Sequence, residues 1–451
     1  MIRECSTWNQ IAAAESRCFT WNTGYLPALL RRSKTAPCAT ISPPRTPRAG
    51  TVISLERYTR LLSRADLRRA VIASTIGRLP IGVTGLAILM LVQDTTGSYG
   101  KAGTVAAAYV AGLAFIAPIL GRIIDRYGPR IALAVTSFAF PASLAGLVTA
   151  ARLDTAEAAA YGCAVAAGAF FPPITVCLRT YLRQQLQDEA ELAVAYSLES
   201  VLIEMIFILG PALVAVFTAL ASPAAAVVFA AASGCVGTLM FGRSPALSQW
   251  RIERREHAGV FGPLAGRGFL ALLAVILCYA TAFGLVEIGT TAYAAEIGQP
   301  AVAGVLLAVM SVGSALGGLV YGSRSWRLPL EKQFPRMLAV MGIGIAPLAL
   351  IAAPGPFTAW CALAGVSMAP ALIMQSMLVA RLARPEHATE AFTWSSTALL
   401  AGVSLGLSLG GALLEIARSA AVFGSAAAIA IAAGALAPGL VRRRAAKTGE
   451  I

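Results

Sequence analysis

The 451-residue sequence has few charged residues and almost no histidine, and both shortages narrow what the protein can do. Only 13% of the residues are charged and 57% are apolar, which excludes a disordered chain and argues against a water-soluble globule. The two histidines, His257 and His387, fall in predicted loops. A zinc site or a Ser-His-Asp hydrolase therefore has little to build with, and we expect neither an enzyme nor a bound metal or cofactor.

The cysteines and the basic residues also exclude several classes of protein. Eight cysteines are scattered without a CxxC pair, and five lie in apolar segments, so neither a disulfide framework nor a metal site is indicated. The net charge of +14 comes from short basic clusters between apolar segments, which is typical of membrane loops rather than of nucleic-acid binding. We therefore expect a lipid bilayer and a small molecule as partners.

Residues 1–51 differ from the rest of the chain. They are polar, contain Arg and Pro, and lack the continuous apolar core of a signal peptide. We interpret them as a disordered extension or as the result of a start site assigned too early, with Val52 as the alternative start. Residues 54–69 then form a basic amphipathic segment at the membrane surface. N-terminal sequencing of the native protein would settle the start.

Twelve apolar segments follow, and a helix of about 20 residues is enough to cross the hydrocarbon core. Their approximate limits are 70–93, 103–120, 131–151, 156–178, 190–218, 223–242, 268–293, 300–321, 336–353, 356–380, 390–416 and 420–440. Connections on one side hold three basic residues, whereas the other side, counted from Val52, holds 25. Positive residues accumulate in the cytoplasm, so we expect a multi-pass plasma-membrane protein with both termini inside.

The spans divide into two sets that show traces of repetition. Short segments recur at shifts of 198 to 201 residues: 163–166 at 361–364, 210–213 at 410–413, and 102–103 at 303–304. We therefore expect a six-helix bundle over 52–242, a cytoplasmic linker over 243–267, a second bundle over 268–441 and a basic tail over 442–451. Parallel repeats of this kind place a transport site between the two halves.

One short polar stretch, residues 121–130, joins the second and third spans. Its turn-forming and charged residues are Gly121, Arg122, Asp125, Arg126, Gly128, Pro129 and Arg130. The glycines allow close approach and positive φ, and the proline can occupy the first turn of the next helix. The arginines mark the cytoplasmic side. The aspartate is the only acid in the stretch, so we expect it to pair with these arginines or with a helix N-terminus.

The stretch resembles the most recognisable motif of the major facilitator superfamily, Gly-x-x-x-Asp-Arg-x-Gly-x-Arg/Lys between helices 2 and 3. The matching residues are Gly121, Asp125, Arg126, Gly128 and Arg130. The resemblance implies an all-α membrane protein with 12 helices in two pseudo-symmetric six-helix bundles around a central cavity. It also implies that this loop gates the cytoplasmic side during alternating access.

Ionisable residues within the spans are functional candidates, because placing each charged side chain in the bilayer costs about 3 kcal/mol of insertion free energy. Arg78 lies near the middle of span 1, where it must face a cavity or an acid. Its functional role would be to bind a substrate anion or a carboxylate, and the alternative is a structural pair or a side chain that snorkels to the surface. Glu199 and Glu204 on span 5 are candidates for proton coupling, since a carboxylate in a low-dielectric site can bind and release a proton near neutral pH. Neutralisation by hydrogen bonds or by Arg78 is the alternative. Glu287 near the outer end of span 7 suits gating or interface exposure equally.

Two further features bear on mechanism. Arg179 ends span 4, and we interpret it as snorkelling to the cytoplasmic surface. Gly210-Pro211 on span 5 resembles the end of a Gly-Pro motif of the superfamily's proton-coupled exporters, where the segment is thought to seal the outer end between the halves. The match is partial. This chain also has Arg78 where those exporters often have an acid in span 1, so their proton path cannot be transferred to it.

We therefore predict a monomeric secondary transporter that exports small molecules, as in drug or metabolite efflux, by proton antiport. Proton-coupled nutrient uptake on the same scaffold is the alternative, and everted vesicles would distinguish accumulation from extrusion. A non-transporting membrane sensor would have a cavity blocked by large side chains, whereas the expected interfaces here are rich in Ala, Gly and Ser.

Overall fold

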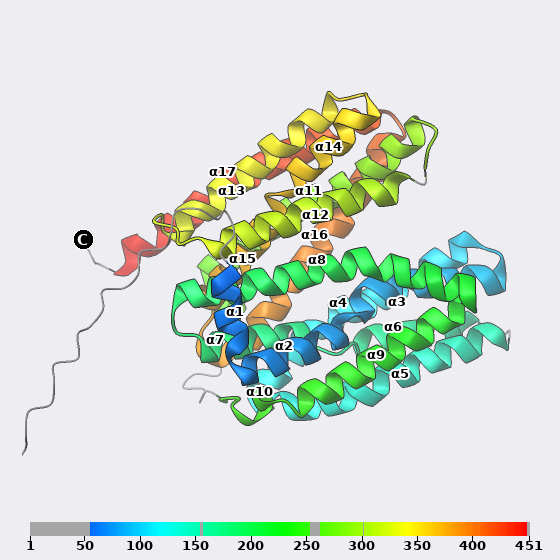
Figure 1. Cartoon of the computed structure of the whole chain (residues 1–451), viewed down its shortest axis with the longest axis horizontal. Helices are drawn as coiled ribbons and strands as arrows, with labels where there is room; N and C mark the ends of the chain where they lie inside the picture. The colour runs from blue at the N-terminus through cyan, green and yellow to red at the C-terminus, as the bar shows by residue number, and fades with distance from the viewer. Residues whose placement is uncertain (1–54, 154–156, 253–261, 301, 449–451) are drawn as a thin grey trace, which may run out of the picture. The chain divides into compact units, whose positions relative to one another are not determined.

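The computed structural model describes residues 55–153, 157–252, 262–300 and 302–448, all within one compact unit, Thr51–Ile451. The expectation for residues 1–51 concerns residues outside this described part. Within it, every regular element is a helix (Figure 1). The all-α fold expected from the apolar segments is therefore confirmed.

The helices before the linker form what we call the N-terminal group. They are α1 (Leu55–Ser63), α2 (Ala65–Arg78), α3 (Pro80–Thr96), α4 (Tyr99–Tyr127), α5 (Pro129–Arg152), α6 (Glu157–Ala169), α7 (Ile174–Gln185), α8 (Glu189–Leu220) and α9 (Pro223–Gly242). Two short elements lie in the described parts of the linker: α10 (Pro245–Ser248) and η1 (Gly262–Ala265).

The helices after the linker form the C-terminal group. They are α11 (Arg267–Glu296), α12 (Val302–Ser323), α13 (Leu330–Ile345), η2 (Ala346–Ala349), α14 (Pro354–Gly365), α15 (Met368–Leu382), η3 (Pro385–His387), α16 (Ala388–Leu414) and α17 (Ser419–Thr448). The groups contact each other mainly through α4 with α16 and α8 with α12 (Figure 1).

In the described part of the chain, 11 helices or interrupted helix pairs are long and apolar enough to cross a membrane. The remaining predicted span, the ninth (336–353), corresponds to α13 and η2, where α13 has only 16 residues. Three spans are interrupted where the backbone cannot continue as an α-helix. Pro80 starts α3, because proline has no N–H for the preceding turn, and Pro172-Pro173 separates α6 from α7. The third break, at 366–367, separates α14 from α15.

The connection between the second and third spans is much shorter than predicted. The sequence suggested a loop of about ten residues, but α4 continues to Tyr127 and α5 begins at Pro129. Gly128 alone makes the turn, with φ of 83°, and Pro129 occupies the first position of α5, as expected. At the other end of the chain, α17 continues to Thr448, so the helix extends into the residues predicted as a basic tail.

Small residues allow the helices within each group to pack backbone to backbone. On α16, for example, an added Cβ at Gly406 would collide with the carbonyl oxygen of Thr281 on α11. Such stripes are the usual means by which helices associate closely in a membrane. Gly406 therefore serves as a packing contact between helices in this structure.

Candidate functional site: a gate and membrane-embedded charges

The most extensive polar contacts between the groups lie at one end of the molecule. We call this the basic end: it carries the α4–α5, α7–α8 and α15–α16 turns and the linker, around which the basic clusters gather. The other end is called the opposite end. The motif over residues 121–130 lies at the basic end and gives the first part of the site.

Asp125 closes the seam between the groups by binding a helix N-terminus. It lies in the last turn of α4 and is only 9% exposed. Its carboxylate accepts hydrogen bonds from the backbone N–H groups of Thr389 (2.9 Å) and Glu390 (2.7 Å), in the first turn of α16. These N–H groups have no partner within their own helix, and the helix dipole favours a negative charge there. The expected pairing of Asp125 with a helix N-terminus is thus what the structure shows.

A second ion pair crosses the same seam. Arg122 on α4 donates from Nε (3.1 Å) and Nη2 (2.5 Å) to Glu390 Oε1 on α16. Glu390 is 1% exposed, and His387 Nδ1 lies 3.7 Å from its other oxygen. Glu390 was not among the residues expected from the sequence, although an acid at the first residue of a predicted span was a visible signal.

The motif residues divide into two sets. Gly121 packs against α16, since an added Cβ would lie 2.5 Å from Thr393 Oγ1. Arg126 lies 5.2 Å from the ring of Tyr127, and Arg130 is exposed at the start of α5. Among the described residues, neither of these two arginines forms an ion pair across the seam. The motif residues that close the seam at the basic end are therefore Gly121, Arg122 and Asp125.

Further contacts close the basic end. Ser197 Oγ on α8 donates to the carbonyl of Gly318 on α12 (2.5 Å), and Arg381 on α15 pairs with Glu189 on α8 (3.1 Å). Tyr58 on α1 contacts Ser197 Oγ (2.8 Å) and donates to the carbonyl of Leu319 (3.0 Å). Burial raises the pKa of Tyr58, so its hydroxyl stays neutral and can donate. Helix α1 therefore contributes to the closed seam at the basic end, which its sequence did not reveal.

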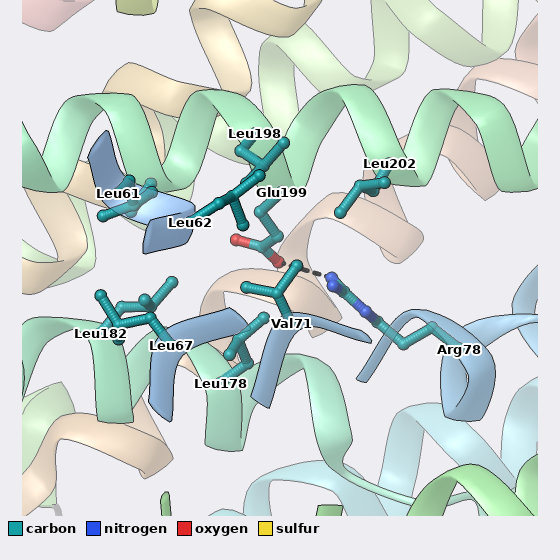
Figure 2. Close-up of a pocket in the computed structure, with 11 residues that line it drawn as sticks. Leu61, Leu62, Leu67, Val71, Arg78, Leu178, Leu182, Leu198, Glu199 and Leu202 are labelled. Atoms are coloured by element: carbon teal, nitrogen blue, oxygen red, sulfur yellow. Dashed lines mark hydrogen bonds and ion pairs between the residues drawn. The ribbon is translucent and has the colours of Figure 1, made fainter. Parts of the chain in front are cut away.

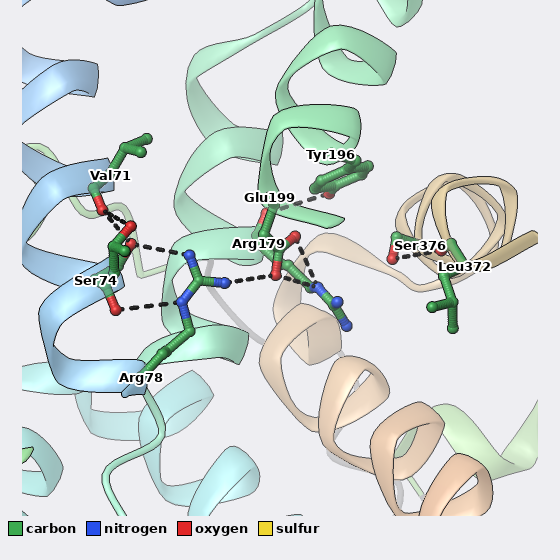
Figure 3. Close-up of polar contacts among 9 residues, drawn as sticks. Val71, Ser74, Arg78, Arg179, Tyr196, Glu199, Leu372 and Ser376 are labelled. Carbon is green, nitrogen blue, oxygen red and sulfur yellow. Dashed lines mark hydrogen bonds and ion pairs between the residues drawn. The ribbon is translucent and has the colours of Figure 1, made fainter. Parts of the chain in front are cut away.

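The second part of the site is a buried cluster of charges inside the N-terminal group (Figure 3). Arg78 Nη1 lies 3.1 Å from Glu199 Oε1, and Arg179 Nε lies 2.9 and 3.0 Å from the two Glu199 oxygens. Arg78 also donates to the carbonyl and hydroxyl of Ser74. The structure thus gives Arg78 and Glu199 the paired arrangement that the sequence analysis held as the structural alternative for each.

The interpretation of Arg179 as a snorkelling residue is not what the structure shows. The helix continues to Gln185, six residues past Arg179, and the side chain is only 12% exposed. Glu199 pairs with the Arg179 guanidinium, so the helix stays buried beyond the point where hydropathy alone ends the span. The cluster holds two guanidinium groups and one carboxylate, which leaves one positive charge in excess. In Figure 3 the Arg179 guanidinium extends towards α15, near Ser376 and Leu372.

Arg78 is sealed from any substrate in this state. The cavity beside it is lined mainly by leucines, including Leu61, Leu178 and Leu202 (Figure 2). Its volume is only ≈10 Å³, about the space for one water molecule. Arg78 itself is 1% exposed, against 12% for Arg179. Arg179 is therefore the more exposed arginine of the cluster.

Glu204 forms the third part of the site and lies on the seam. Ser314 Oγ on α12 donates to Glu204 Oε1 across the two groups (2.6 Å), and the same hydroxyl accepts the N–H of Ala369 in the first turn of α15 (3.0 Å). Among the described residues, no cation lies within ion-pair distance of Glu204. Glu287, the remaining candidate on α11, is exposed and is not joined to this network by any described contact.

The halves of the helices towards the opposite end are less covered. On α8, residues beyond 203 are buried only at Ile206, Gly210 and Val214. On α16, residues beyond 395 are buried only at Gly402, Gly406 and Gly410. A spacing of four residues marks a single face, and each face packs within its own group, against α3 and α11 respectively. The seam is therefore closed at the basic end and open towards the opposite end.

The Gly210-Pro211 segment lies in this open half. An added Cβ at Gly210 would collide with the backbone of Gly82 on α3, which is in the same group. Pro211 is exposed within α8. In this state, the described packing of Gly210 joins two helices of the N-terminal group and does not seal the seam.

Comparison with known proteins agrees with this architecture. The family model described as Major Facilitator Superfamily matches residues 70–388, about seven-tenths of the chain. No curated protein sequence matches significantly. Among solved structures, the human organic anion transporter MFSD10 (TETRAN) is similar with a TM-score of 0.66 and 17% identity, over 82% of this chain and 99% of that chain.

Two other solved structures share the fold. A bacterial homologue of the iron transporter ferroportin in its outward-facing state gives a TM-score of 0.67 at 14% identity, over 84% of this chain and 99% of that one. A variant of the Escherichia coli fucose:proton symporter gives 0.65 at 12% identity, over 84% and 98%. At these identities the likeness shows the fold alone. The family match extends over most of the chain, and so this protein belongs to the major facilitator superfamily, a family of membrane transporters and not of enzymes.

Proposed function

We propose that this transporter exports small organic anions in exchange for protons, with the basic end in the cytoplasm. The orientation is supported by the excess of basic residues at that end, because loops rich in Lys and Arg stay on the cytoplasmic side of the membrane. In this orientation the structure corresponds to an outward-open state, because the seam is closed by Asp125, Arg122 and Glu390 at the basic end. The similar ferroportin homologue was also solved facing outward.

The proposal of proton coupling depends on the position and contacts of Glu204. It is a carboxyl group on the seam without a described cationic partner, whereas Glu199 is held between two arginines. A proton on Glu204 changes the charge at one of the contacts that α8 and α12 must break during alternating access. Glu199 is a poorer candidate, because protonation there would leave two guanidinium groups without a carboxylate.

The substrate class follows from the excess charge of the buried cluster. Two guanidinium groups share one carboxylate, and a buried positive charge without a partner is costly. An anion bound beside the Arg179 guanidinium would remove this imbalance, and a planar guanidinium suits carboxylates and phosphates. The similar human protein MFSD10 is named as an organic anion transporter, which supports the same class.

Charge movement favours export over uptake for such a substrate. One anion leaving and one proton entering move two charges down the membrane potential, at about 2.3 kcal/mol per charge for every 100 mV. Symport of one proton with one anion would gain nothing from the potential. Uptake remains the alternative function, since the similar Escherichia coli protein is a fucose:proton symporter. Everted vesicles distinguish the two, because export appears there as accumulation.

The Glu204→Gln variant tests proton coupling. In everted vesicles, the wild type should accumulate a transported anion faster when the vesicle lumen is acidic, and Glu204→Gln should lose this stimulation because the amide cannot bind the coupling proton. Exchange of labelled for unlabelled anion without a pH gradient should persist. Glu415→Gln is the matched control, because Glu415 is an exposed acid at the opposite end. Unchanged stimulation in Glu204→Gln would remove proton coupling through this residue.

The Arg179→Gln variant tests the substrate class. Loss of one charged hydrogen-bonding partner, about 1.5 to 3 kcal/mol, should raise the KM for organic anions by about tenfold or more. Arg179→Lys should be intermediate, because lysine keeps the charge but not the planar fork. The measurement is uptake by everted vesicles of a panel of monocarboxylates and phosphonates beside their uncharged amides. Equal KM values for wild type and Arg179→Gln would contradict the assignment.

A further inference from the structure

A second basic site lies away from the seam, between α2, α5, α9 and α10. It is a cleft of ≈580 Å³, and three of its lining residues are arginines from separate segments: Arg69 on α2, Arg130 on α5 and Arg243 after α9. All three side chains are exposed. The rest of its lining is largely apolar and includes Ile72 and Met240. We call it the arginine cleft.

Within the lining of the arginine cleft, no acid balances the three positive charges. None of its lining residues is Asp or Glu. Among the described residues, the ion pairs at the basic end are made by other arginines, such as Arg122, Arg179 and Arg381. Three guanidinium groups facing one cleft repel one another, and an anion between them converts this repulsion into attraction.

The chemistry of the lining defines the anion. Guanidinium groups bind phosphate oxygens through paired, charge-assisted hydrogen bonds. Arg130 and Arg243 lie at helix ends, and Arg69 lies in the second turn of α2. The ends of membrane helices lie at the headgroup layer, and the exposed apolar side chains of Ile72 and Met240 line the same cleft. A free phosphate ion gains nothing from contact with apolar side chains, whereas the acyl chain of a phospholipid can pack against them.

We propose that the arginine cleft binds the phosphate group of an anionic phospholipid from the leaflet at the basic end. This site gives a role to Arg130, one of the two motif arginines that form no described ion pair across the seam. The turn at Gly128 joins it directly to α4, and Arg130 lies five residues after Asp125 in the chain. A lipid bound here would therefore stabilise the position of α5 next to α4, the helix that carries Asp125. The proposal depends on the membrane location of the chain and not on its substrate.

The test measures lipid binding by the purified full-length protein. Wild type is compared with the triple variant Arg69→Gln/Arg130→Gln/Arg243→Gln and with a matched triple variant, Arg324→Gln/Arg327→Gln/Arg336→Gln, which removes three exposed arginines from the C-terminal group. Native mass spectrometry in detergent titrates phosphatidylglycerol and, separately, phosphatidylcholine. With about 1 kcal/mol per arginine, the first variant should bind phosphatidylglycerol about 100-fold more weakly. The second should bind it like the wild type.

The outcomes separate the sources of the phosphate. Equal affinity of the two triple variants for phosphatidylglycerol would overturn the proposal, as would equal binding of phosphatidylcholine and phosphatidylglycerol by the wild type. Inorganic phosphate is added as a competitor, and displacement of the lipid at equal concentration would assign the cleft to free phosphate and overturn the lipid source. Arg243→Lys serves as a milder variant that keeps the charge. It should retain most of the binding if the first variant has lost it through charge and not through misfolding.

Discussion

Replacing Asp125 by asparagine should reduce transport by about tenfold or more while leaving membrane insertion and expression unchanged. The carboxylate accepts two backbone hydrogen bonds at the N-terminus of α16. The amide has no charge, and its NH2 group would face an N–H donor. Charge-assisted hydrogen bonds contribute about 1.5 to 3 kcal/mol, so the closed state of the basic end should lose about 100-fold in population. Transport is then slower because the carrier rests with its basic end open.

Cysteine accessibility measures this shift directly. Thr393 lies at the closed seam against Gly121, so a Thr393→Cys side chain is shielded when the basic end is closed. In the Asp125→Asn background, it should react faster with a maleimide supplied from the basic end. Arg126→Gln is the control, since Arg126 contacts only Tyr127 among the interactions described for it. Equal labelling and transport in Asp125→Asn and wild type would remove the gating role of Asp125.

Replacing Glu199 by glutamine should destabilise the folded protein by about 3 to 5 kcal/mol, the usual cost of leaving buried charges without their partner. Glu199 is 2% exposed and is the carboxylate between Arg78 and Arg179. The amide would leave the two adjacent guanidinium groups of Arg78 and Arg179 without a carboxylate partner. The measurement is the thermal unfolding midpoint in detergent, where a loss of this size should be visible as a large downward shift.

A compensating variant distinguishes lost charge balance from lost packing. Arg78→Gln/Glu199→Gln restores the original excess of one positive charge, so it should be more stable than Glu199→Gln alone, although both positions are changed. Glu191→Gln is the control, because Glu191 pairs with Arg64 at the exposed surface and such pairs contribute about 0 to 1 kcal/mol. If the double variant unfolds at a lower temperature than the single one, the charge explanation is wrong.

The residues that the sequence could identify are those with a local signal. Asp125 was found because it is the only acid in a tight basic turn, and Gly128 because such a turn needs positive φ. The apolar segments predicted the helices well, because hydrocarbon excludes unpaired backbone groups whatever the tertiary arrangement.

What the sequence could not predict depends on partners distant in the chain. The N–H groups bound by Asp125 lie 264 and 265 residues away, and no local pattern announces that pairing. Arg179 was assigned to the surface for the same reason. Hydropathy ends a span at the first charge, and only the fold brings Glu199 close enough to neutralise it. Glu390 was overlooked because its partner Arg122 is 268 residues away.

Tyr58 gives the short helix α1 a use as a reporter. Its hydroxyl bridges Ser197 on α8 and the Leu319 carbonyl on α12, and these two helices belong to different groups. One of the two bonds must break whenever the groups part, so α1 has to travel with one partner and leave the other. A spin label at the exposed neighbour Thr59, paired with labels on each group, would reveal which one it follows.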